Sequence, residues 1–275
     1  MAQSSDTDDV TVIAHRGFAG RYPENTVGAV EGATRGETSA DTVEIDVQPT
    51  ADGTPVVCHD SRLDGREDGG LTDATGVVRE TDTATVTGAS VLGTTETVPT
   101  LADLLSAVPP SVGVNVELKN PGTHDVAPGR RLSAAELADR GDVWRPFTRS
   151  VLDIVGEYDN DILFSSFCEA ALSTVREQAP SLPVAALCAD DIRTGLHVAR
   201  RYDCEAIHVP LDMVPGTPSF DAERFGDIDV CGVAHDEGRA VNVWTVETWH
   251  QARGVAAAGA DGIIADYPGL LDFER

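Results

Sequence analysis

Carboxylates stand inside two segments that are otherwise apolar. Glu44 and Asp46 lie two residues apart in TVEIDV, and Glu117 stands two residues before Lys119 in VNVELK. Residues two apart on a strand share a face, and buried carboxylates are costly unless they are paired or bind a metal. Three such groups from neighbouring strands would form an all-oxygen site for one divalent cation, Mg²⁺ or Ca²⁺, whereas zinc takes more His and Cys ligands. Outward-facing surface acids are the alternative in so acidic a chain.

Two histidines and an arginine accompany these carboxylates. His15 ends the run VTVIAH and precedes Arg16 and Gly17, while His59 follows PVVC. The planar fork of Arg fits a phosphate, and Gly permits close backbone approach. Two histidines on opposite sides of one metal can act as general base and general acid. The alternatives are a structural role for His15 at a strand end and a surface-loop position for His59.

Lys119 is the only lysine among 20 basic residues, the others being Arg. Because a chain so poor in Lys retains one beside a buried-looking carboxylate, we predict that its ammonium contacts a phosphate as a point charge. Asn242, Trp244 and Val246 share one face of the run AVNVWTV. Trp244 could wall off an apolar or polyol group, or it could be an ordinary core residue.

Apolar, β-branched runs would position these side chains. They cover residues 10–15, 42–47, 112–119, 161–167, 183–188, 206–210, 240–246 and 262–266. Helix-like segments separate several of them, at 24–36, 100–108, 147–158, 168–179, 191–202 and 248–259. Buried parallel strands read as such runs, and their alternation with helices implies right-handed βαβ units. Eight runs predict an α/β fold, a closed (β/α)8 TIM-type barrel with catalytic groups at the strand ends. An open doubly wound sheet is the alternative.

The run PVVCHD at 55–60 interrupts this rhythm. It follows the second strand across residues 48–54 alone, which is shorter than the dozen or so residues of a parallel crossover. We therefore predict an antiparallel return with its turn at Asp52-Gly53, which lays His59 over the barrel mouth.

The remaining segments define the domain organisation. Residues 1–9 are expected to form a disordered tail and residues 10–270 a single barrel domain. Within that domain, the polar segment 60–100 predicts a small inserted subdomain after the second strand, and residues 121–146 predict a second insertion.

Composition excludes several classes of function. Among 275 residues, 46 are acidic and 20 basic, a net charge of −26 that disfavours nucleic acid and anionic membrane surfaces as partners. No apolar run approaches the roughly 18 residues of a spanning helix, so stable membrane insertion is not expected. An acidic, lysine-poor surface indicates adaptation to concentrated salt, with an acidic interaction surface as the alternative. Five scattered cysteines and a polar N-terminus predict a cytoplasmic protein.

Taken together, the motifs resemble the glycerophosphodiester phosphodiesterase family, within the phospholipase C-like phosphodiesterase superfamily. They run in the family's order from Ile13 to Pro268: AHRGFAGRYPENT, VEIDVQPTADGTPVVCHD, NVELKN, FSSF, VNVWTV and GADGIIADYP. The resemblance implies a TIM-type barrel and metal-dependent hydrolysis of a small glycerophosphodiester to glycerol phosphate and an alcohol. It implies the following site: catalytic His15 and His59, metal ligands Glu44, Asp46 and Glu117, phosphate ligands Arg16 and Lys119, and a stacking Trp244.

Two other functions remain compatible with these residues. Phosphatidylinositol-type phospholipases C and lysophospholipase D-like phosphodiesterases share the barrel and the two histidines, but the acidic chain without a hydrophobic rim favours a soluble substrate. A non-catalytic barrel that binds a polyol phosphate is disfavoured because both histidines are present. The 60–100 and 121–146 segments depart from the usual family form, which leaves the alcohol group open.

Overall fold

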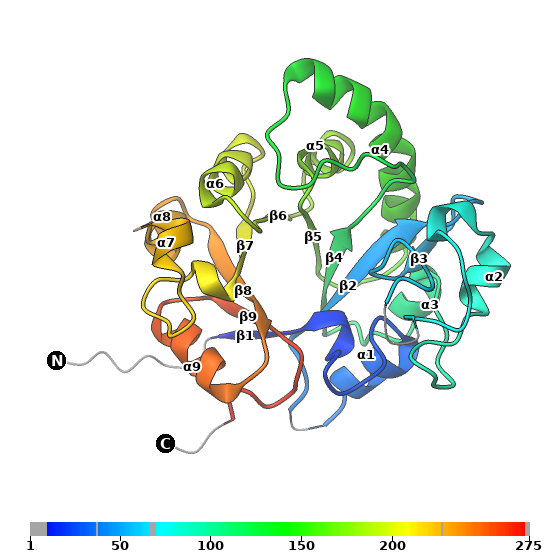
Figure 1. Ribbon diagram of the computed structural model, residues 1–275, viewed down its shortest axis with the longest axis horizontal. Helices are drawn as coiled ribbons and strands as arrows, with labels where there is room; N and C mark the ends of the chain where they lie inside the picture. Colours follow the sequence, from blue (N-terminus) through cyan, green and yellow to red (C-terminus); the bar gives the residue numbers. More distant parts are fainter. Residues whose placement is uncertain (1–9, 37, 67–69, 227, 273–275) are drawn as a thin grey trace.

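The computed structural model describes residues 10–36, 38–66, 70–226 and 228–272, so the expected tail at 1–9 lies outside the described residues. Eight parallel strands form a barrel that closes where β1 pairs with both β2 and β9 (Figure 1). They are β1 (Thr11–Ala14), β2 (Thr42–Pro49), β4 (Gly113–Leu118), β5 (Ile162–Ser166), β6 (Val184–Leu187), β7 (Ala206–Pro210), β8 (Ala240–Val246) and β9 (Gly262–Ala265). The predicted (β/α)8 barrel is confirmed, and an open sheet is excluded.

The short strand β3 (Pro55–Val57) runs antiparallel to β2, with Val57 opposite Val47. The connecting turn places Gly53 at a φ of 79°, and its N–H donates to the carbonyl of Thr50 over 3.0 Å. A left-handed φ favours glycine, so the Asp52-Gly53 turn forms as predicted and returns the chain toward the barrel mouth.

Helices surround the barrel. They are α1 (Val27–Ala33), α2 (Thr83–Thr87), α3 (Leu101–Leu105), α4 (Ala134–Val155), α5 (Glu169–Gln178), α6 (Ile192–Arg201), α7 (Ala222–Phe225), α8 (Val230–Asp236) and α9 (Trp249–Ala257). Single 3-10 turns occupy η2 (His15–Gly17), η3 (Val78–Glu80) and η4 (Leu211–Met213). Among the described residues, none of the helices has the length and apolar character that a bilayer span requires.

Helix α4 corrects the sequence-based expectation of a helix beginning at Phe147. It begins at Ala134, because the Ser133 hydroxyl accepts from the Glu136 backbone N–H while the Glu136 carboxylate accepts from the Ser133 N–H. Such a capping box stabilises a helix start. Pro146 lies inside the helix rather than at its boundary, so the second half of the expected 121–146 insertion is helical. Helices α7 and α8 were also not expected from the sequence.

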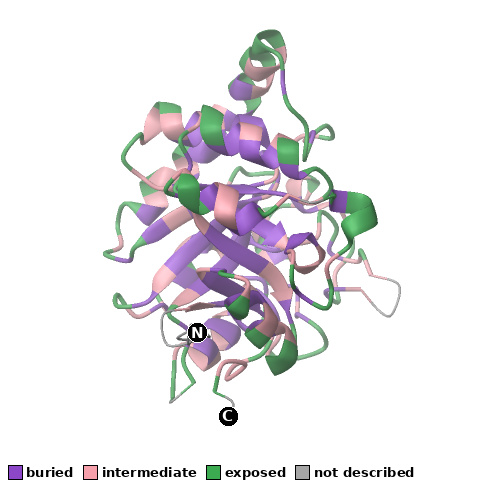
Figure 2. Ribbon diagram, turned by 90° about the vertical axis from the view of Figure 1, so that its left-hand side faces the viewer, coloured by how far each residue is buried: buried purple, intermediate pink, exposed green. Residues whose placement is uncertain are grey.

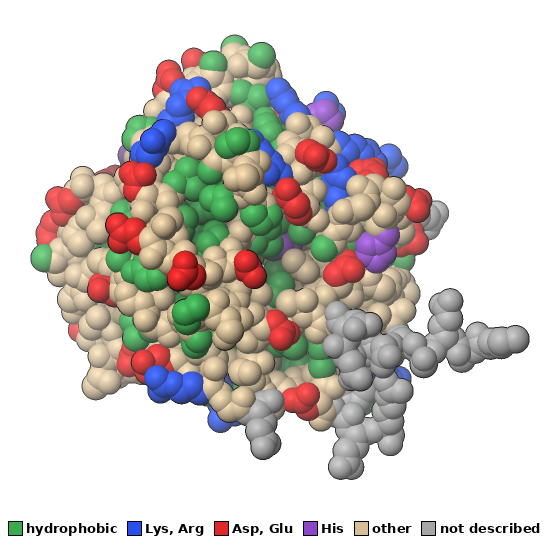
Figure 3. All heavy atoms as spheres, turned by 180° about the vertical axis from the view of Figure 1, so that it is seen from behind, with side chains coloured by type: hydrophobic (Ala, Val, Ile, Leu, Met, Phe, Trp, Pro, Cys, Tyr) green, Lys and Arg blue, Asp and Glu red, His purple; other side chains and the backbone are tan. Residues whose placement is uncertain are grey.

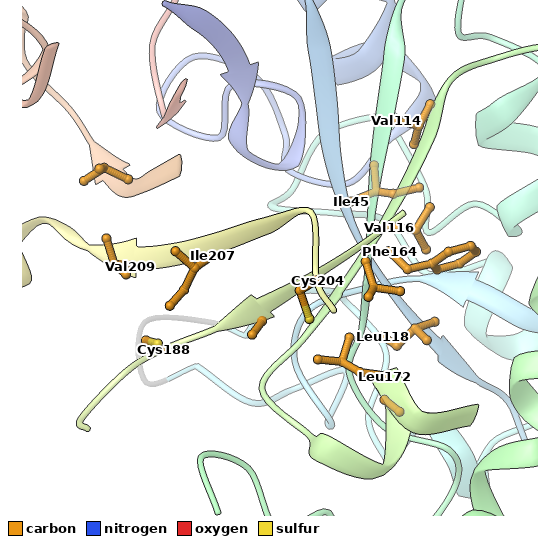
Figure 4. Packing of buried hydrophobic residues seen from close by; sticks show 14 of the residues in the cluster. Ile45, Val114, Val116, Leu118, Phe164, Leu172, Cys188, Cys204, Ile207 and Val209 are labelled. Atoms are coloured by element: carbon orange, nitrogen blue, oxygen red, sulfur yellow. The ribbon is translucent and has the colours of Figure 1, made fainter. Parts of the chain in front are cut away.

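The core lies between the strands and the helices, where buried residues concentrate (Figure 2). Ile45, Val116 and Phe164 are in register on β2, β4 and β5 and all are fully buried. Figure 4 shows these side chains together in the core. Because side chains alternate along a strand, the residues between them on β2 and β4 face the barrel interior.

The segment that follows β3 shares a small core with that strand, made of Val56, Cys58, Leu63, Leu71, Val78, Val86, Val91 and Val98. It contains η3 and α2, and isolated bridges hold together those of its loops that the structure describes. Arg79 lies 2.6 Å from the Nδ1 of His124, so this segment meets the chain that follows β4. Both segments therefore border the same side of the barrel mouth.

Candidate active site

Strand register brings the predicted carboxylates together. On adjacent strands β2 and β4, Asp46 pairs with Glu117, and Glu44 pairs with Asn115. Glu44, Asp46 and Glu117 each offer an oxygen within 4.8 Å of those of the others, and their exposed fractions are 4%, 1% and 9%. Three converging carboxylate oxygens suit a hard divalent cation, so this donor set fits the expected Mg²⁺ or Ca²⁺.

Two basic side chains face this cluster. The Arg16 guanidinium lies 2.9 Å from Glu24 Oε1 and 3.2 Å from Asp46 Oδ2. The Lys119 ammonium lies 2.7 Å from Glu117 Oε1 and 3.4 Å from Asp46 Oδ1. Both cations thus hold carboxylates while they also border the cavity described below.

The electrostatics of the three carboxylates differ. Burial raises the pKa of Glu44 well above its usual range, and the charges of Asp46 and Glu117 add to this effect. Burial also raises the pKa of Glu117, which Lys119 only partly offsets. Burial alone would raise the pKa of Asp46 too, but Lys119 and Arg16 outweigh it and hold that pKa below its usual range.

Glu44 forms no ion pair with any described residue, and its carboxylate accepts the Arg16 backbone N–H over 3.0 Å. The cluster therefore carries more potential negative charge than its own cations balance. A divalent cation would relieve this imbalance where the three carboxylates meet.

The turn η2 explains the sequence His15-Arg16-Gly17. Arg16, Gly17 and Phe18 all have left-handed φ values, of 51°, 77° and 64°, which aim the Arg16 N–H at Glu44. A Cβ on Gly17 would lie 2.8 Å from the Cβ of Ala29 in α1. The close backbone approach that this glycine permits is therefore to helix α1.

Each predicted histidine is held by a carboxylate. The Nδ1 of His15 lies 2.6 Å from Asp266 Oδ1, and the Nδ1 of His59 lies 2.8 Å from Asp60 Oδ1. An Nδ1–H donated to a carboxylate fixes the ring and leaves Nε2 available for proton transfer. Arg66 supports this arrangement because it bonds both Asp60 and Glu24, over 2.8 Å each.

Two adjoining cavities lie at the mouth. The inner cavity, of about 170 Å³, is lined by His15, Arg16, Glu44, His59, Asn115, Glu117, Lys119, Ser165, Phe167, Leu187, His208, Trp244, Thr245 and Ile264. The outer cavity, of about 640 Å³, is lined among others by Gln48, Asp60, Arg66, Asn120, Val126 and Pro128. His59, Glu117, Lys119 and Phe167 border both. All predicted site residues except Asp46 thus line the inner cavity, and Asp46 lies beside it within the carboxylate cluster.

Trp244 is a cavity wall rather than a core residue. Its ring meets that of Phe167 edge-on, with centroids 5.7 Å apart, and Lys119 Nζ lies 5.8 Å from the centroid of the same Phe167 ring. The aromatic pair therefore forms one side of the inner cavity.

Sequence reasoning assigned no role to several residues that shape the site. Asp60 directly follows His59, and Asn25, whose amide donates to Asp46 over 2.9 Å, stands in the motif PENT, so each had a local signal. Asp266 ends the run 262–266 and stands in the motif GADGIIADYP, so it also had a local signal, although its partner His15 lies 251 residues away.

Comparisons with known proteins agree with this architecture. The glycerophosphoryl diester phosphodiesterase family matches residues 15–270. A glycerophosphodiester phosphodiesterase of Caldanaerobacter subterraneus subsp. tengcongensis is 28% identical over 268 residues, which cover 94% of this chain and 95% of that protein. One of Bacillus altitudinis is 26% identical over 266 residues, which cover 94% of both. The solved structure of an Oleispira antarctica phosphodiesterase in complex with the product sn-glycerol-3-phosphate has a TM-score of 0.73 at 23% identity, covering 98% of this chain and 100% of that one, and so shares the fold.

Proposed function

Because the chain belongs to the glycerophosphoryl diester phosphodiesterase family, it is a phosphodiester hydrolase, and we propose that it cleaves its substrate in the inner cavity. The substrate is a small glycerophosphodiester, and the products are glycerol phosphate and an alcohol. The observation that carries this proposal is the convergence of a carboxylate cluster and two carboxylate-held histidines on one cavity.

Glu44, Asp46 and Glu117 would hold one divalent cation, Mg²⁺ or Ca²⁺. When bound, such a cation supplies positive charge that stabilises the phosphoryl oxygens in the transition state. Lys119 and Arg16 supplement this charge from the cavity wall, Lys119 from the junction between the two cavities.

His15 and His59 divide the proton transfers in this proposal. One Nε2 takes the proton of the nucleophile, which is water or the neighbouring hydroxyl of the glyceryl group, and the other protonates the departing alkoxide. Asp266 and Asp60 keep the two rings oriented and stabilise each imidazolium as it forms.

The test is turnover of glycerophosphocholine by the purified protein in high salt, followed as glycerol phosphate released. Chelator should abolish turnover, and added Mg²⁺ or Ca²⁺ should restore it. Full turnover in excess chelator would contradict the metal site. Near wild-type kcat in both His15→Ala and His59→Ala would contradict the catalytic assignment.

We also propose that the protein works in a reducing compartment such as the cytoplasm. All five cysteines are buried free thiols, and burial raises the pKa of Cys58 to about 12. Such thiols are unreactive, and unpaired cysteines are typical of reducing compartments.

A further inference from the structure

Five residues that line the inner cavity carry a buried polar atom with no hydrogen-bond partner among the described residues. Two of these atoms are donors beside the carboxylate cluster and in the aromatic wall: Arg16 Nε, which lies 3.2 Å from Asp46 Oδ2, and Trp244 Nε1. The other three form what we call the floor of the cavity. They are Asn115 Oδ1 from β4, Ser165 Oγ from β5 and His208 Nδ1 from β7. The three residues are 1%, 0% and 0% exposed, and all three line the inner cavity. Buried polar atoms in folded proteins are nearly always paired, so an unpaired set on one cavity is available to a bound water or ligand.

The three atoms of the floor differ in whether they donate or accept a hydrogen bond. The Asn242 amide donates to His208 Nε2 over 3.0 Å, so the proton of His208 lies on Nδ1 and makes it a donor. Burial lowers the pKa of His208 to about 3, so the ring is neutral. Asn115 Oδ1 is an acceptor, and Ser165 Oγ is both donor and acceptor.

A neutral donor, an acceptor and a hydroxyl together complement an alcohol group. A phosphate would need donors alone, and a metal ion would need acceptors alone. The inner cavity is also lined by the apolar side chains of Leu187 and Ile264. The floor therefore suits a short carbon chain that ends in a hydroxyl.

The arrangement of the two cavities indicates where each of the two ester-linked groups, or arms, of a phosphodiester would lie. His59, Glu117 and Lys119 border both cavities, so the phosphoryl group belongs at this junction. One arm then enters the inner cavity of about 170 Å³, and the other enters the outer cavity of about 640 Å³. The short glyceryl arm fits the smaller space, and the outer space is free to accept alcohols of differing size.

We propose that Asn115, Ser165 and His208 bind the terminal hydroxyl of the substrate's glyceryl group and so determine specificity for glyceryl diesters. This inference rests on the proposed function, and it adds recognition residues to that site.

The first experiment compares two choline diesters, of glycerol phosphate and of propane-1,2-diol phosphate, which lacks only the terminal hydroxyl. A buried site built for a hydroxyl rejects an analogue that leaves its polar groups unpaired, and each unpaired group costs about tenfold or more. Wild-type kcat/KM should therefore favour the glyceryl diester by at least about 10²-fold. A ratio within threefold of one would overturn the inference without any variant.

The second experiment asks whether the floor sets that ratio. Ser165→Ala should reduce the preference by about tenfold, the effect of one lost hydrogen bond, and Asn115→Leu should act in the same direction. Ser166→Ala is the matched control, because this neighbouring buried hydroxyl already donates to the Leu118 carbonyl over 2.7 Å. It should leave the ratio unchanged even if both rates fall, whereas an unchanged ratio in Ser165→Ala would overturn the inference.

Binding measurements distinguish a failure of this inference from a failure of the proposed function. Calorimetry with glycerol 3-phosphate and with propane-1,2-diol 1-phosphate reports on the floor without turnover. Preference for glycerol 3-phosphate in a protein that hydrolyses neither diester would support the floor and contradict the function. Hydrolysis of both diesters at equal rates, with equal binding of both monoesters, would contradict the floor and leave the function standing.

Discussion

Replacing Lys119 by Arg keeps the positive charge but changes its shape. The Lys119 ammonium lies 2.7 Å from Glu117 Oε1 and 3.4 Å from Asp46 Oδ1, and its side chain is 18% exposed. The flat guanidinium is wider than an ammonium and cannot place one nitrogen between these two oxygens without moving one of them. We expect a displacement of about 1 Å at the junction of the two cavities, where the phosphoryl group would lie.

A misplacement of about 1 Å can reduce the rate by about 10²-fold, so kcat/KM of Lys119→Arg on glycerophosphocholine should fall by that order. Lys119→Met removes the charge as well and should be at least as damaging. Calorimetric titration should nevertheless show Mg²⁺ or Ca²⁺ bound at least as tightly in Lys119→Met, because a cation that competes for the carboxylates is gone.

Two controls make this prediction sharp. Arg149→Lys exchanges the same pair of side chains on the exposed side of α4, where Arg149 bonds Gln178 over 3.0 Å, and should leave activity unchanged. Thermal unfolding of each variant checks the fold. A loss smaller than threefold in Lys119→Arg would mean that the lysine serves only as a surface charge, and the reasoning would fail.

Three further predictions follow from the structure. Asp266→Asn removes the charge that holds His15 and should lower kcat by roughly 10²-fold or more with little change in KM, whereas Asp261→Asn, at the exposed pair with His235, should leave kcat unchanged. Burial lowers the pKa of His208 to about 3 in the folded chain. Between about pH 6.5 and pH 3, only the unfolded chain therefore binds a proton at this histidine. The free energy of unfolding should fall by up to about 1.4 kcal/mol per pH unit as the pH is lowered through this range. Denaturant titrations at several pH values give the dependence of the unfolding free energy on pH, which should be weaker by this amount in His208→Gln than in the wild type. An equal dependence in both proteins would contradict the buried neutral ring. Lowering KCl from 2 M to 0.1 M should reduce the unfolding temperature, because the Debye length increases from about 3 Å near 1 M to about 10 Å at 0.1 M. Activity should fall with it once the barrel begins to unfold at the assay temperature, and an unchanged unfolding temperature would contradict this prediction.

Two regularities made most of the barrel and the carboxylate cluster predictable: side chains alternate between the two faces of a strand, and consecutive strands lie side by side. In TVEIDV the apolar residues face the helices, so Glu44 and Asp46 must face the interior. The same rule places Asn115 and Glu117 beside them on the neighbouring strand. Because sequential strands of a barrel are neighbours, the sequence alone predicts that residues about 70 positions apart lie close together.

What the sequence could not supply depends on tertiary contacts. Pro146 suggested that a helix begins after it, but α4 continues across the proline and packs against α5, where the hydroxyls of Thr148 and Thr174 lie 2.9 Å apart. The direction of the Arg16 guanidinium was equally hidden, because its partner Glu24 stands in a loop without periodicity. Local patterns report which residues are buried, whereas the partner of a buried charge is decided by the whole fold.

Exposed and buried charges of this protein should respond differently to salt. Acidic side chains are dispersed over the face shown in Figure 3, and repulsion among such exposed charges is long-ranged and screened by salt. The pairs of Lys119 and Arg16 with Asp46 lie within 3.4 Å in a buried site, where dissolved ions screen much less. Salt should accordingly control whether the barrel stays folded, and the chemistry of the inner cavity should remain the same at any salt concentration that keeps it folded.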